Sequence, residues 1–213
     1  MHKAEGDMAL DAIQLATWAD ELRAMAAIGL IYAHDPYDRT RYIRMQQIAA
    51  AMLGAATRAD PPAVLDVLTL ETGYITVKVG VAAAVFDTTG RVLLVQRQDN
   101  KQWAMPGGWA DVGETAAEMV AREVREETGL TVRVERLLGV YDSRRRRFGH
   151  PHHLYHLVFL CIPFAGEPIV TAETLDVRWF TADTVPALSS GHHDPLLDAF
   201  RAWADPHMPA IFD

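Results

Sequence analysis

Cysteine is nearly absent from this sequence, since Cys161 is the single cysteine among 213 residues. One thiol excludes an intramolecular disulfide, and its position in an apolar, strand-like stretch predicts a buried structural residue rather than a nucleophile. Long apolar runs are absent too, because none approaches the roughly 18 residues that cross a bilayer. The first seven residues lack the basic start and apolar core of a signal peptide. We therefore expect a cytoplasmic protein with no membrane partner.

Basic residues are also scarce. The chain has 20 Lys and Arg against 28 Asp and Glu, which gives a formal net charge of −8. This balance argues against a nucleic-acid-binding surface, although a local basic patch could override it. Half of the residues are hydrophobic and 23% are charged, as in an ordinary globular domain. We expect no nucleic-acid partner.

The N-terminal part shows helical periodicity. Apolar residues recur every three or four positions between residues 15 and 32, which predicts one long helix. Asp35-Pro36 interrupts it with a cap candidate and a proline suited to a first helical turn. A second stripe follows, and Asp60-Pro61-Pro62 ends it before a connection over 63–73 that contains a short helical turn. The stripes consist of Leu15, Trp18, Leu22, Met25, Gly29 and Tyr32, then Tyr42, Met45, Ala49 and Met52.

Two such helices joined by a short connection form a helical hairpin. A hairpin of this size cannot bury both stripes by itself, so we expect it to pack on the rest of the chain or on another subunit. The pattern therefore predicts an N-terminal domain over 1–73 and a homodimer formed through it.

From residue 74 the pattern changes to strands. Val77 to Phe86 alternates around apolar residues, and Asp87 to Gly90 has turn chemistry, which predicts a hairpin with a return strand over 91–97. After a central helix, further elements are expected at 131–140, 154–163, 177–180 and 194–204, the last being a helix. This order predicts an α/β domain over 74–213, built as an α/β/α sandwich with a mixed sheet.

The stretch from Gly107 to Leu130 contains a compact group of acidic residues. Glu123, Glu126 and Glu127 are spaced i, i+3 and i+4, so a helix places them on one face. Like charges this close repel one another, and hard divalent cations with oxygen ligands neutralise such groups. The spacing therefore indicates a magnesium site, but a solvated charged face explains it equally well.

Neighbouring residues define this helix. Thr115 and Glu118 form a capping box that starts it, and Gly129 ends it. Arg122 lies four residues before Glu126 and can brace that carboxylate. The core-facing side is expected to consist of Ala117, Val120, Ala121 and Val124.

The spacing of the whole stretch resembles the Nudix box at every defined position. The matching residues are Gly108, Glu114, Arg122, Glu123, Val124, Glu126, Glu127, Gly129 and Leu130. The resemblance implies the same α/β/α sandwich and the hydrolysis of a nucleoside diphosphate linked to another moiety, X. It also implies that Glu123, Glu126 and Glu127, helped by the Gly107 carbonyl, hold Mg²⁺, for which Mn²⁺ could substitute.

By the same resemblance, the catalytic residues would be Glu127, Glu123 and Arg122. Glu127 is the first candidate for the general base or a ligand of a second metal. Glu173 is an alternative acid outside the box, or a solvated loop residue. Glu114 would order the loop or hydrate a metal, and the products would be a nucleoside monophosphate and phosphorylated X.

The N-terminal hairpin has a resemblance of its own. Gly29 to Tyr32, Asp35 to Arg39 and Glu71 to Tyr74 resemble the helical extension of a bacterial Nudix subgroup. Members of that subgroup act as CDP-choline or ADP-ribose pyrophosphatases, so the resemblance implies a nucleoside diphosphate-linked small molecule of this class as the partner.

Several residues are candidates for substrate binding, each with an alternative. Arg97, at a strand end, would contact a phosphate or form a surface ion pair. The run Arg144 to Arg147 would capture a phosphate or remain a solvated loop. Tyr155, Phe148 and Trp109 would stack on a base or serve in packing.

Paired histidines suggest zinc at first sight. They are His150, His152 and His153, then His192 and His193. No cysteine or carboxylate stands at zinc-site spacing from them. Ordinary loop histidines, phosphate contacts or a subunit contact explain them better.

Two other functions share the box. An enzyme that sanitises nucleoside triphosphates would release inorganic pyrophosphate instead of phosphorylated X. A Nudix-fold sensor that controls transcription would need a DNA-binding module, and Asp35 and Asp38 offset the arginines of the hairpin, where no helix-turn-helix pattern is evident.

Overall fold

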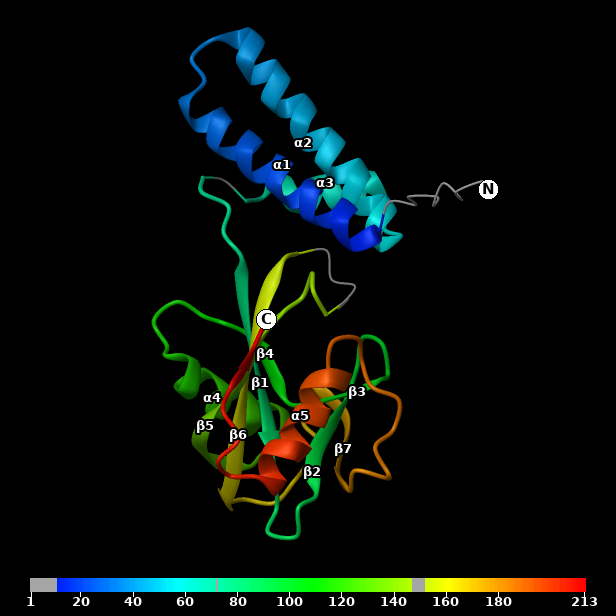
Figure 1. Ribbon diagram of the computed structural model, residues 1–213, viewed down its shortest axis with the longest axis vertical. Coiled ribbons are helices and arrows are strands. Elements are labelled where there is room, and N and C mark those ends of the chain that lie inside the picture. The colour runs from blue at the N-terminus through cyan, green and yellow to red at the C-terminus, as the bar shows by residue number, and fades with distance from the viewer. Residues whose placement is uncertain (1–10, 72, 147–151) are drawn as a thin grey trace, which may run out of the picture. The chain divides into compact units, whose positions relative to one another are not determined.

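The computed structural model of the protein describes residues 11–71, 73–146 and 152–213. These residues form two compact units (Figure 1). The first consists of the described residues up to Val77 together with His152 and His153, and the second begins at Lys78. The sequence led us to expect a boundary after residue 73. None of the helices in the described ranges combines the length and the hydrophobicity that a membrane span needs.

Three helices make up the N-terminal unit: α1 (Ala12–Tyr32), α2 (Pro36–Thr57) and α3 (Pro61–Thr69). An aspartate precedes each helix, and its carboxylate accepts a backbone N–H from the first turn. In α2 and α3 a proline follows that aspartate, where a missing N–H removes no helical hydrogen bond. The two long helices are confirmed. The expected short turn is longer than predicted, because Asp60 and Pro61 start a helix of nine residues.

The hairpin packs through small side chains. A Cβ at Gly29 would come within 2.4 Å of the Tyr42 ring, so the helices approach closely there. The larger residues of the predicted α1 stripe point elsewhere, because Trp18, Met25 and Tyr32 remain 44%, 56% and 61% exposed. The buried core of the unit consists of Ala16, Ala19, Ala49, Ala50, Leu53, Val64 and Leu68.

Two sheets make up the second unit. The five-stranded sheet has the order β4-β1-β6-β5-β8, with β1–β6 and β5–β8 parallel and the other pairs antiparallel. The three-stranded sheet is antiparallel, in the order β3-β2-β7. The strands are β1 (Lys78–Val85), β2 (Val92–Arg97), β3 (Trp103–Ala104), β4 (Gly107–Trp109), β5 (Thr131–Asp142), β6 (Leu154–Ala165), β7 (Thr174–Phe180) and β8 (Ile211–Phe212).

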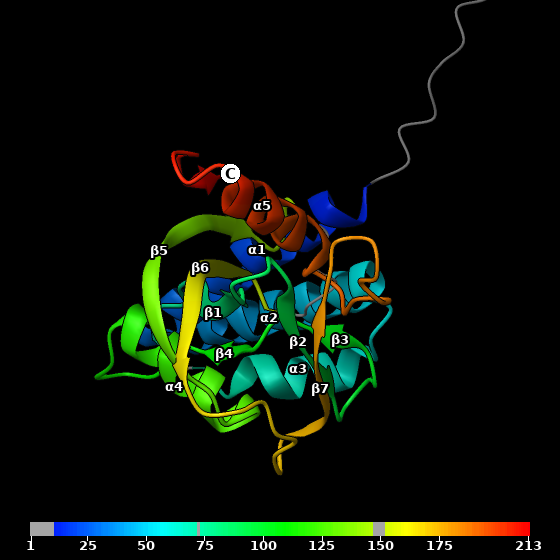
Figure 2. The same ribbon diagram turned by 90° about the horizontal axis from the view of Figure 1, so that it is seen from below.

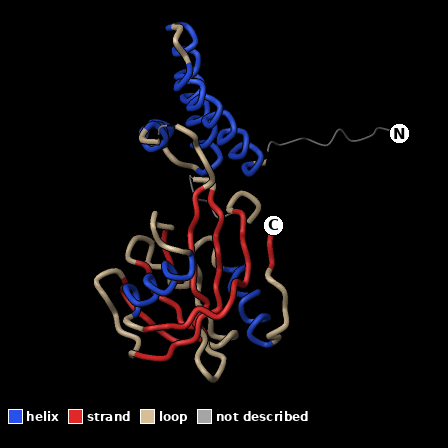
Figure 3. Tube along the Cα trace, turned by 90° about the vertical axis from the view of Figure 1, so that its left-hand side faces the viewer, coloured by secondary structure: helices blue, strands red, loops and turns tan. Residues whose placement is uncertain are grey.

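Helices cover these strands on both sides. Figures 2 and 3 show α4 (Ala116–Thr128) and α5 (His193–Ala204) on opposite faces, with the strands between them. Strand β1 illustrates the arrangement, because Ala82 and Ala84 join the core under α5 whereas Val81, Ala83 and Val85 join the core under α4. A strand buried on both faces is apolar throughout. The predicted α/β/α sandwich with a mixed sheet is confirmed.

One predicted pairing is wrong. Residues 87–90 form the expected turn, in which the Asp87 carboxylate accepts the N–H groups of Thr89 and Arg91. However, β1 and β2 do not form a hairpin and meet only at the bridge between Phe86 and Val92. The reason is that β4 and β6 occupy both edges of β1, so β2 continues into the other sheet.

Two smaller differences concern side-chain burial. Ala117 is exposed on α4, and Met119 is buried in its place beside Val120 and Val124. Cys161 is buried as predicted, and burial raises the pKa of its thiol to about 12, so the thiolate is scarce at neutral pH.

Candidate active site

Helix α4 is fixed at both ends by local hydrogen bonds. The Thr115 hydroxyl accepts the N–H of Glu118, and the Glu118 carboxylate accepts the N–H of Thr115, which confirms the capping box. Gly129 ends the helix with a φ of 75°, and its N–H donates to the Arg125 carbonyl. The helix therefore begins and ends where the sequence predicts, which fixes the direction of its glutamates.

Two glycines of β4 bring the backbone against those glutamates. The Gly107 N–H donates to the Glu127 carboxylate at 2.9 Å. A Cβ at Gly108 would lie 2.7 Å from the Glu123 carboxylate, and one at Gly107 would lie 2.1 Å from the Val81 carbonyl oxygen. Only glycine permits these approaches at both positions. The strand thus lies between β1 and the acidic face of α4.

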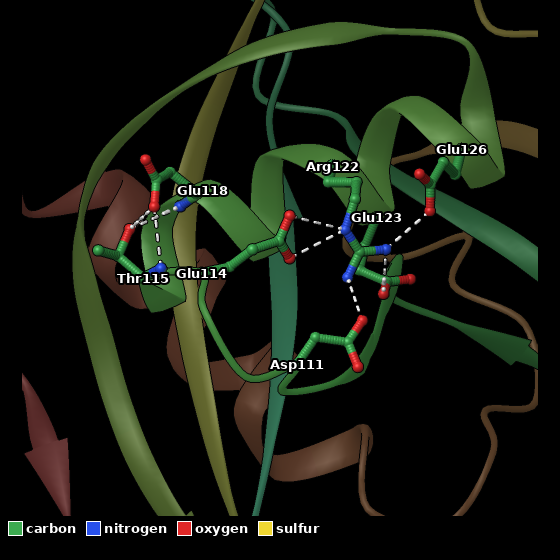
Figure 4. A network of polar contacts seen from close by, with 7 residues as sticks. All are labelled: Asp111, Glu114, Thr115, Glu118, Arg122, Glu123 and Glu126. Carbon is green, nitrogen blue, oxygen red and sulfur yellow. Dashed lines mark hydrogen bonds and ion pairs between the residues drawn. The ribbon is translucent and has the colours of Figure 1, made fainter.

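Arg122 holds the acidic loop on the helix (Figure 4). Its guanidinium contacts Glu126 at 2.8 Å, which confirms the predicted brace. It also donates to Glu114 at 3.0 Å and to Asp111 at 3.1 Å, both in the loop before the helix, and pairs with Glu123 at 3.1 Å. These carboxylates raise the pKa of Arg122 further above its ordinary value, with the Glu114 hydrogen bond contributing most. Asp111 is a member of this network that the sequence reasoning missed.

Burial raises the pKa values of Glu123 and Glu127. Burial raises the pKa of Glu127 to about 7, and the charges of Glu123 and Glu173 add to this effect. The Gly107 N–H and the Arg97 charge oppose it. Burial also raises the pKa of Glu123, against the opposing charge of Arg122. The site therefore holds carboxyl groups in surroundings that disfavour their negative charge.

A bound divalent cation would stabilise the negative charge of these carboxylates, which burial disfavours. Within residues 11–71, 73–146 and 152–213, no three His, Cys, Asp or Glu side chains already converge as a set of metal ligands. The donor chemistry fits a hard cation, because Glu123 and Glu127 offer carboxylate oxygens whose negative charge burial disfavours, and the nearby Arg122 and Arg97 offset this only in part. Glu126 would have to turn away from Arg122 to join them.

The loop between β6 and β7 is tied to the end of α4. The Ile169 N–H donates to the Thr128 carbonyl at 2.9 Å, and the Thr174 hydroxyl donates to the Glu127 carbonyl at 3.2 Å. This loop carries Glu173, whose charge raises the pKa of both Glu123 and Glu127. The alternative acid from the sequence therefore lies within electrostatic reach of the glutamates.

Arg97 lies at the end of β2 and forms an ion pair with Asp99. Its guanidinium makes a bidentate contact with Asp99, at 3.0 and 2.8 Å. Its charge still reaches the interior, because it lowers the pKa of Glu127 and of His192. The ion pair is one of the two alternatives foreseen for this arginine, and the other, a phosphate contact, stays a prediction.

The described part of the arginine run after β5 is solvated only in part, because Arg145 is exposed whereas Arg144 and Arg146 make contacts with the protein. Arg144 is buried, and its backbone N–H donates to the Asp142 carboxylate at 2.7 Å. Arg146 pairs with Asp213 at 2.8 Å and lies over the Tyr141 ring. The sequence could not foresee the pairing with Asp213, which lies 67 residues away along the chain. Arg147, and with it part of this prediction, lies outside the described residues.

Two of the three aromatic residues that could stack on a base lie in the described part of the chain. Trp109 follows the two glycines on β4, and Tyr155 lies on β6 opposite Val79, with 45% and 40% of their surfaces exposed. Phe148 lies outside the described residues. A stacking role for Tyr155 or Trp109 stays a prediction.

His192 is a candidate that the sequence reasoning did not identify as a site residue. It is buried at the start of α5, and its Nδ1 accepts the N–H of Met105 at 3.3 Å. Burial lowers the pKa of His192 to about 3, assisted by His156 and Arg97. No local pattern could have revealed this contact, because it joins residues 87 positions apart.

Comparisons with known families cover both units. A family described as "NUDIX domain" matches residues 76–200. A family described as "UDP-X-like, N-terminal oligomerisation domain" matches residues 13–68, which contain most of α1, α2 and α3. The two matches follow the same division of the chain as the change from helical to strand periodicity.

Two of the following three relatives match nearly the whole chain. YjhB of Bacillus subtilis (strain 168), named provisionally as an ADP-ribose pyrophosphatase, is 33% identical over 92% of this chain and 95% of its own. An ADP-ribose pyrophosphatase of Methanocaldococcus jannaschii is 33% identical over 55% of this chain and 70% of its own. The crystal structure of a UDP-X diphosphatase covers 96% of this chain and 100% of its own, with 28% identity and a TM-score of 0.60.

Proposed function

This chain belongs to the Nudix family, and we propose that it hydrolyses a nucleoside diphosphate linked to a second moiety, X, into a nucleoside monophosphate and phosphorylated X. The observation that carries this proposal is the apposition of Glu123 and Glu127 to the glycines of β4. That geometry places both carboxylates against the backbone of β4, where they offer oxygen ligands for a cation.

Glu123, Glu126 and Glu127 would hold the divalent cation, together with the Gly107 carbonyl. Mg²⁺ suits these oxygen ligands, and Mn²⁺ could substitute for it. When bound, such a cation neutralises charge on the diphosphate oxygens and makes water a better nucleophile at neutral pH. Supporting this assignment, burial raises the pKa values of both Glu123 and Glu127, although Arg122 and Arg97 act in the opposite direction.

Glu127 is our first candidate for the general base. One of its oxygens accepts the Gly107 N–H, so the carboxylate is held in a fixed orientation and the other oxygen is available to take a proton. Its pKa of about 7 suits proton transfer at neutral pH. Glu173 is the alternative, since its charge acts on the same site.

The remaining catalytic assignment concerns orientation. Arg122 would hold the loop through Asp111 and Glu114 while orienting Glu123 and Glu126. Arg97, Arg144 and Tyr155 remain our candidates for the substrate side. Among these, the Arg97 charge already acts on Glu127.

The relatives narrow the substrate class. Those described above are named for ADP-ribose or for UDP-X, which makes ADP-ribose and UDP-linked compounds the first substrates to test. CDP-choline, suggested by the resemblance of the hairpin, is the third. Each contains the same diphosphate bridge, so the metal chemistry would be the same for all of them. The loops around the site would determine which compound is preferred.

A Mg²⁺-dependent assay over ADP-ribose, UDP-sugars, CDP-choline and nucleoside triphosphates tests the proposal. Products should be identified by phosphorus NMR. We expect a nucleoside monophosphate and phosphorylated X from at least one linked diphosphate. Preferential release of inorganic pyrophosphate from triphosphates would instead assign the chain to triphosphate sanitation, and no turnover of any compound would favour a sensor.

We also propose that the protein forms a homodimer through α1 and α2. Two observations support this: the match of residues 13–68 to an oligomerisation domain, and the exposed large apolar side chains of α1.

A further inference from the structure

Residues 187–189, which precede α5, lie along the edge of β3 that β2 does not occupy. Trp103 donates its N–H to the Ala187 carbonyl at 3.4 Å, and its own carbonyl accepts the Ser189 N–H at 2.7 Å. The other edge of β3 pairs with β2, where Ala104 lies opposite Val95. The segment therefore acts as an additional partner for the short strand, on the side away from β2.

The His192 side chain extends this pairing by one more hydrogen bond. Backbone N–H groups two residues apart in an extended chain point to the same side, so the Met105 N–H points toward the same segment as that of Trp103. At this point the chain after Ser189 has reached the start of α5. The Nδ1 of His192 accepts the Met105 N–H at 3.3 Å, where a backbone carbonyl accepts the N–H of Trp103. Both residues are buried, at 8% and 2% exposure, so no bulk water could replace this acceptor.

The two residues after Met105 are held from other directions. The Pro106 carbonyl accepts the Ala83 N–H from β1 at 2.8 Å. The Gly107 N–H donates to Glu127 of α4 at 2.9 Å. Three successive residues are thus fixed by three elements: the start of α5, strand β1 and helix α4.

The chemistry of His192 suits an acceptor. Burial lowers its pKa to about 3, with His156 and Arg97 adding to the effect, so the ring is neutral at physiological pH. A neutral imidazole has one N–H, and acceptance at Nδ1 requires that proton on Nε2. The His156 ring packs edge-on against it, with centroids 5.7 Å apart.

We propose that His192 is a positioning residue that fixes the main chain at Met105 and thereby aligns Gly107 with Glu127. It acts through the Met105 backbone, from the side of the sheet that α5 covers, whereas Glu127 lies on α4. Its effect on turnover rests on the function proposed above, in which Gly107 and Glu127 hold the cation. Its effect on the backbone at Met105 does not.

Two substitutions of His192 distinguish its role as a hydrogen-bond acceptor from its role in packing. In His192→Asn the side-chain oxygen lies near the former Nδ1, so an acceptor is retained. In His192→Leu the volume is kept but the acceptor is lost. We expect His192→Leu to speed hydrogen exchange of the Met105 amide by about tenfold or more, and to raise the Mg²⁺ concentration for half-maximal turnover by about 10- to 100-fold. His192→Asn should restore most of both properties.

His193→Asn is the matched control. His193 is the next residue, its side chain is exposed, and its Nδ1 lies 3.1 Å from the Asp194 carboxylate. We expect its exchange rates and Mg²⁺ dependence to match those of the wild type. Equal defects in the two His192 variants, or wild-type exchange at Met105 in His192→Leu, would overturn the proposal.

A measurement on the unmodified protein keeps the proposal testable if His192→Leu does not fold. Imidazole ¹⁵N NMR should show His192 as the Nε2–H tautomer with Nδ1 accepting, whereas an Nδ1–H tautomer would refute the assignment. Neither NMR nor hydrogen exchange needs a substrate. If no linked diphosphate is cleaved but these two readouts agree with expectation, the proposed function fails while the positioning role stands.

Discussion

At the residue scale, Glu127 is subject to opposing influences. Burial and neighbouring carboxylates disfavour its charge, whereas the Gly107 N–H and Arg97 favour it, and the balance gives a pKa of about 7. A carboxyl group with this pKa exchanges protons readily at neutral pH. A bound cation would shift the balance toward the ionised form.

Replacing Glu127 by glutamine should abolish most turnover and leave the protein folded. Glutamine keeps the shape but neither takes a proton nor binds a cation well, so kcat should fall about 10²- to 10⁴-fold. Without metal, the folded-state pKa lies above the unfolded value, so the wild type loses stability as pH rises from about 4 to about 7. The glutamine variant should not show this loss, as measured by urea denaturation at pH 5 and pH 8 in EDTA.

Glu167→Gln is a matched control, because Glu167 is an exposed loop residue outside the acidic site. It should retain wild-type kcat. Wild-type turnover by Glu127→Gln would show that Glu127 is not the base, and Glu173→Gln should then be tested in the same assay.

His192 should make stability depend on pH in the opposite sense. Its folded-state pKa is lowered to about 3, so between about pH 6.5 and 3 the unfolded chain binds the proton more readily. Relative to His192→Asn, the wild type should therefore lose stability as pH falls below about 6.5, at up to about 1.4 kcal/mol per pH unit. The check is the difference in unfolding free energy between the two proteins at pH 5 and pH 8.

Burial, His156 and the charge of Arg97 all favour the neutral form of His192, so the three influences give this prediction the same sign. A difference that stays constant between pH 5 and pH 8 would mean that His192 is not held neutral by its surroundings.

At the scale of elements, strand β4 contains two glycines with different tasks. A side chain at Gly107 would meet the backbone of β1, which cannot move without breaking the sheet. The atoms nearest to a side chain at Gly108 would be those of the Glu123 carboxylate, which can rotate away. Fold and activity therefore depend on neighbouring positions of a three-residue strand.

The two alanine substitutions should have separable effects. Gly107→Ala should lower the thermal midpoint strongly, because its Cβ would lie 2.1 Å from the Val81 oxygen. Gly108→Ala should keep a near-wild-type midpoint but lower kcat by about tenfold or more, since Glu123 is displaced from its position. Calorimetry and steady-state kinetics on both variants check this pair, and the idea fails if Gly108→Ala is fully active.

At the scale of the whole molecule, the predicted α1 stripe divides between two surfaces. Small residues such as Ala16 and Ala19 form the contact inside the hairpin. Trp18, Met25 and Tyr32 are seven residues apart, so they lie along nearly one line of the helix and remain exposed. An exposed row of large apolar residues on a helix is suited to packing against a second copy.

Substituting Trp18 and Met25 together by serine should convert a dimer into a monomer. The hairpin should stay folded, because its core consists of other residues. Light scattering coupled to gel filtration at micromolar concentration measures the change, and Glu21→Ser, an exposed polar site on the same helix, is the control. A monomeric wild type under these conditions would rule out the homodimer.

The sequence by itself determined the features that depend on neighbouring residues. The capping box at Thr115, the stop at Gly129 and the Arg122 brace were all predicted and are all present, because each is formed within a few turns of one helix. The layered fold followed from the order of helical and alternating patterns. Substrate-binding roles for Arg97, Arg144 and Tyr155 stay predictions.

Only the tertiary structure decided what distant segments do together. It separated β1 from β2, because other strands occupy both edges of β1. It buried Arg144, paired Arg146 with Asp213, and brought His192 to Met105. It also raised the pKa of Glu127 to about 7, because that value depends on how much water the surrounding chain excludes. Residue spacing fixes which groups share a helix face, but only packing fixes which backbone, charge and solvent those groups meet.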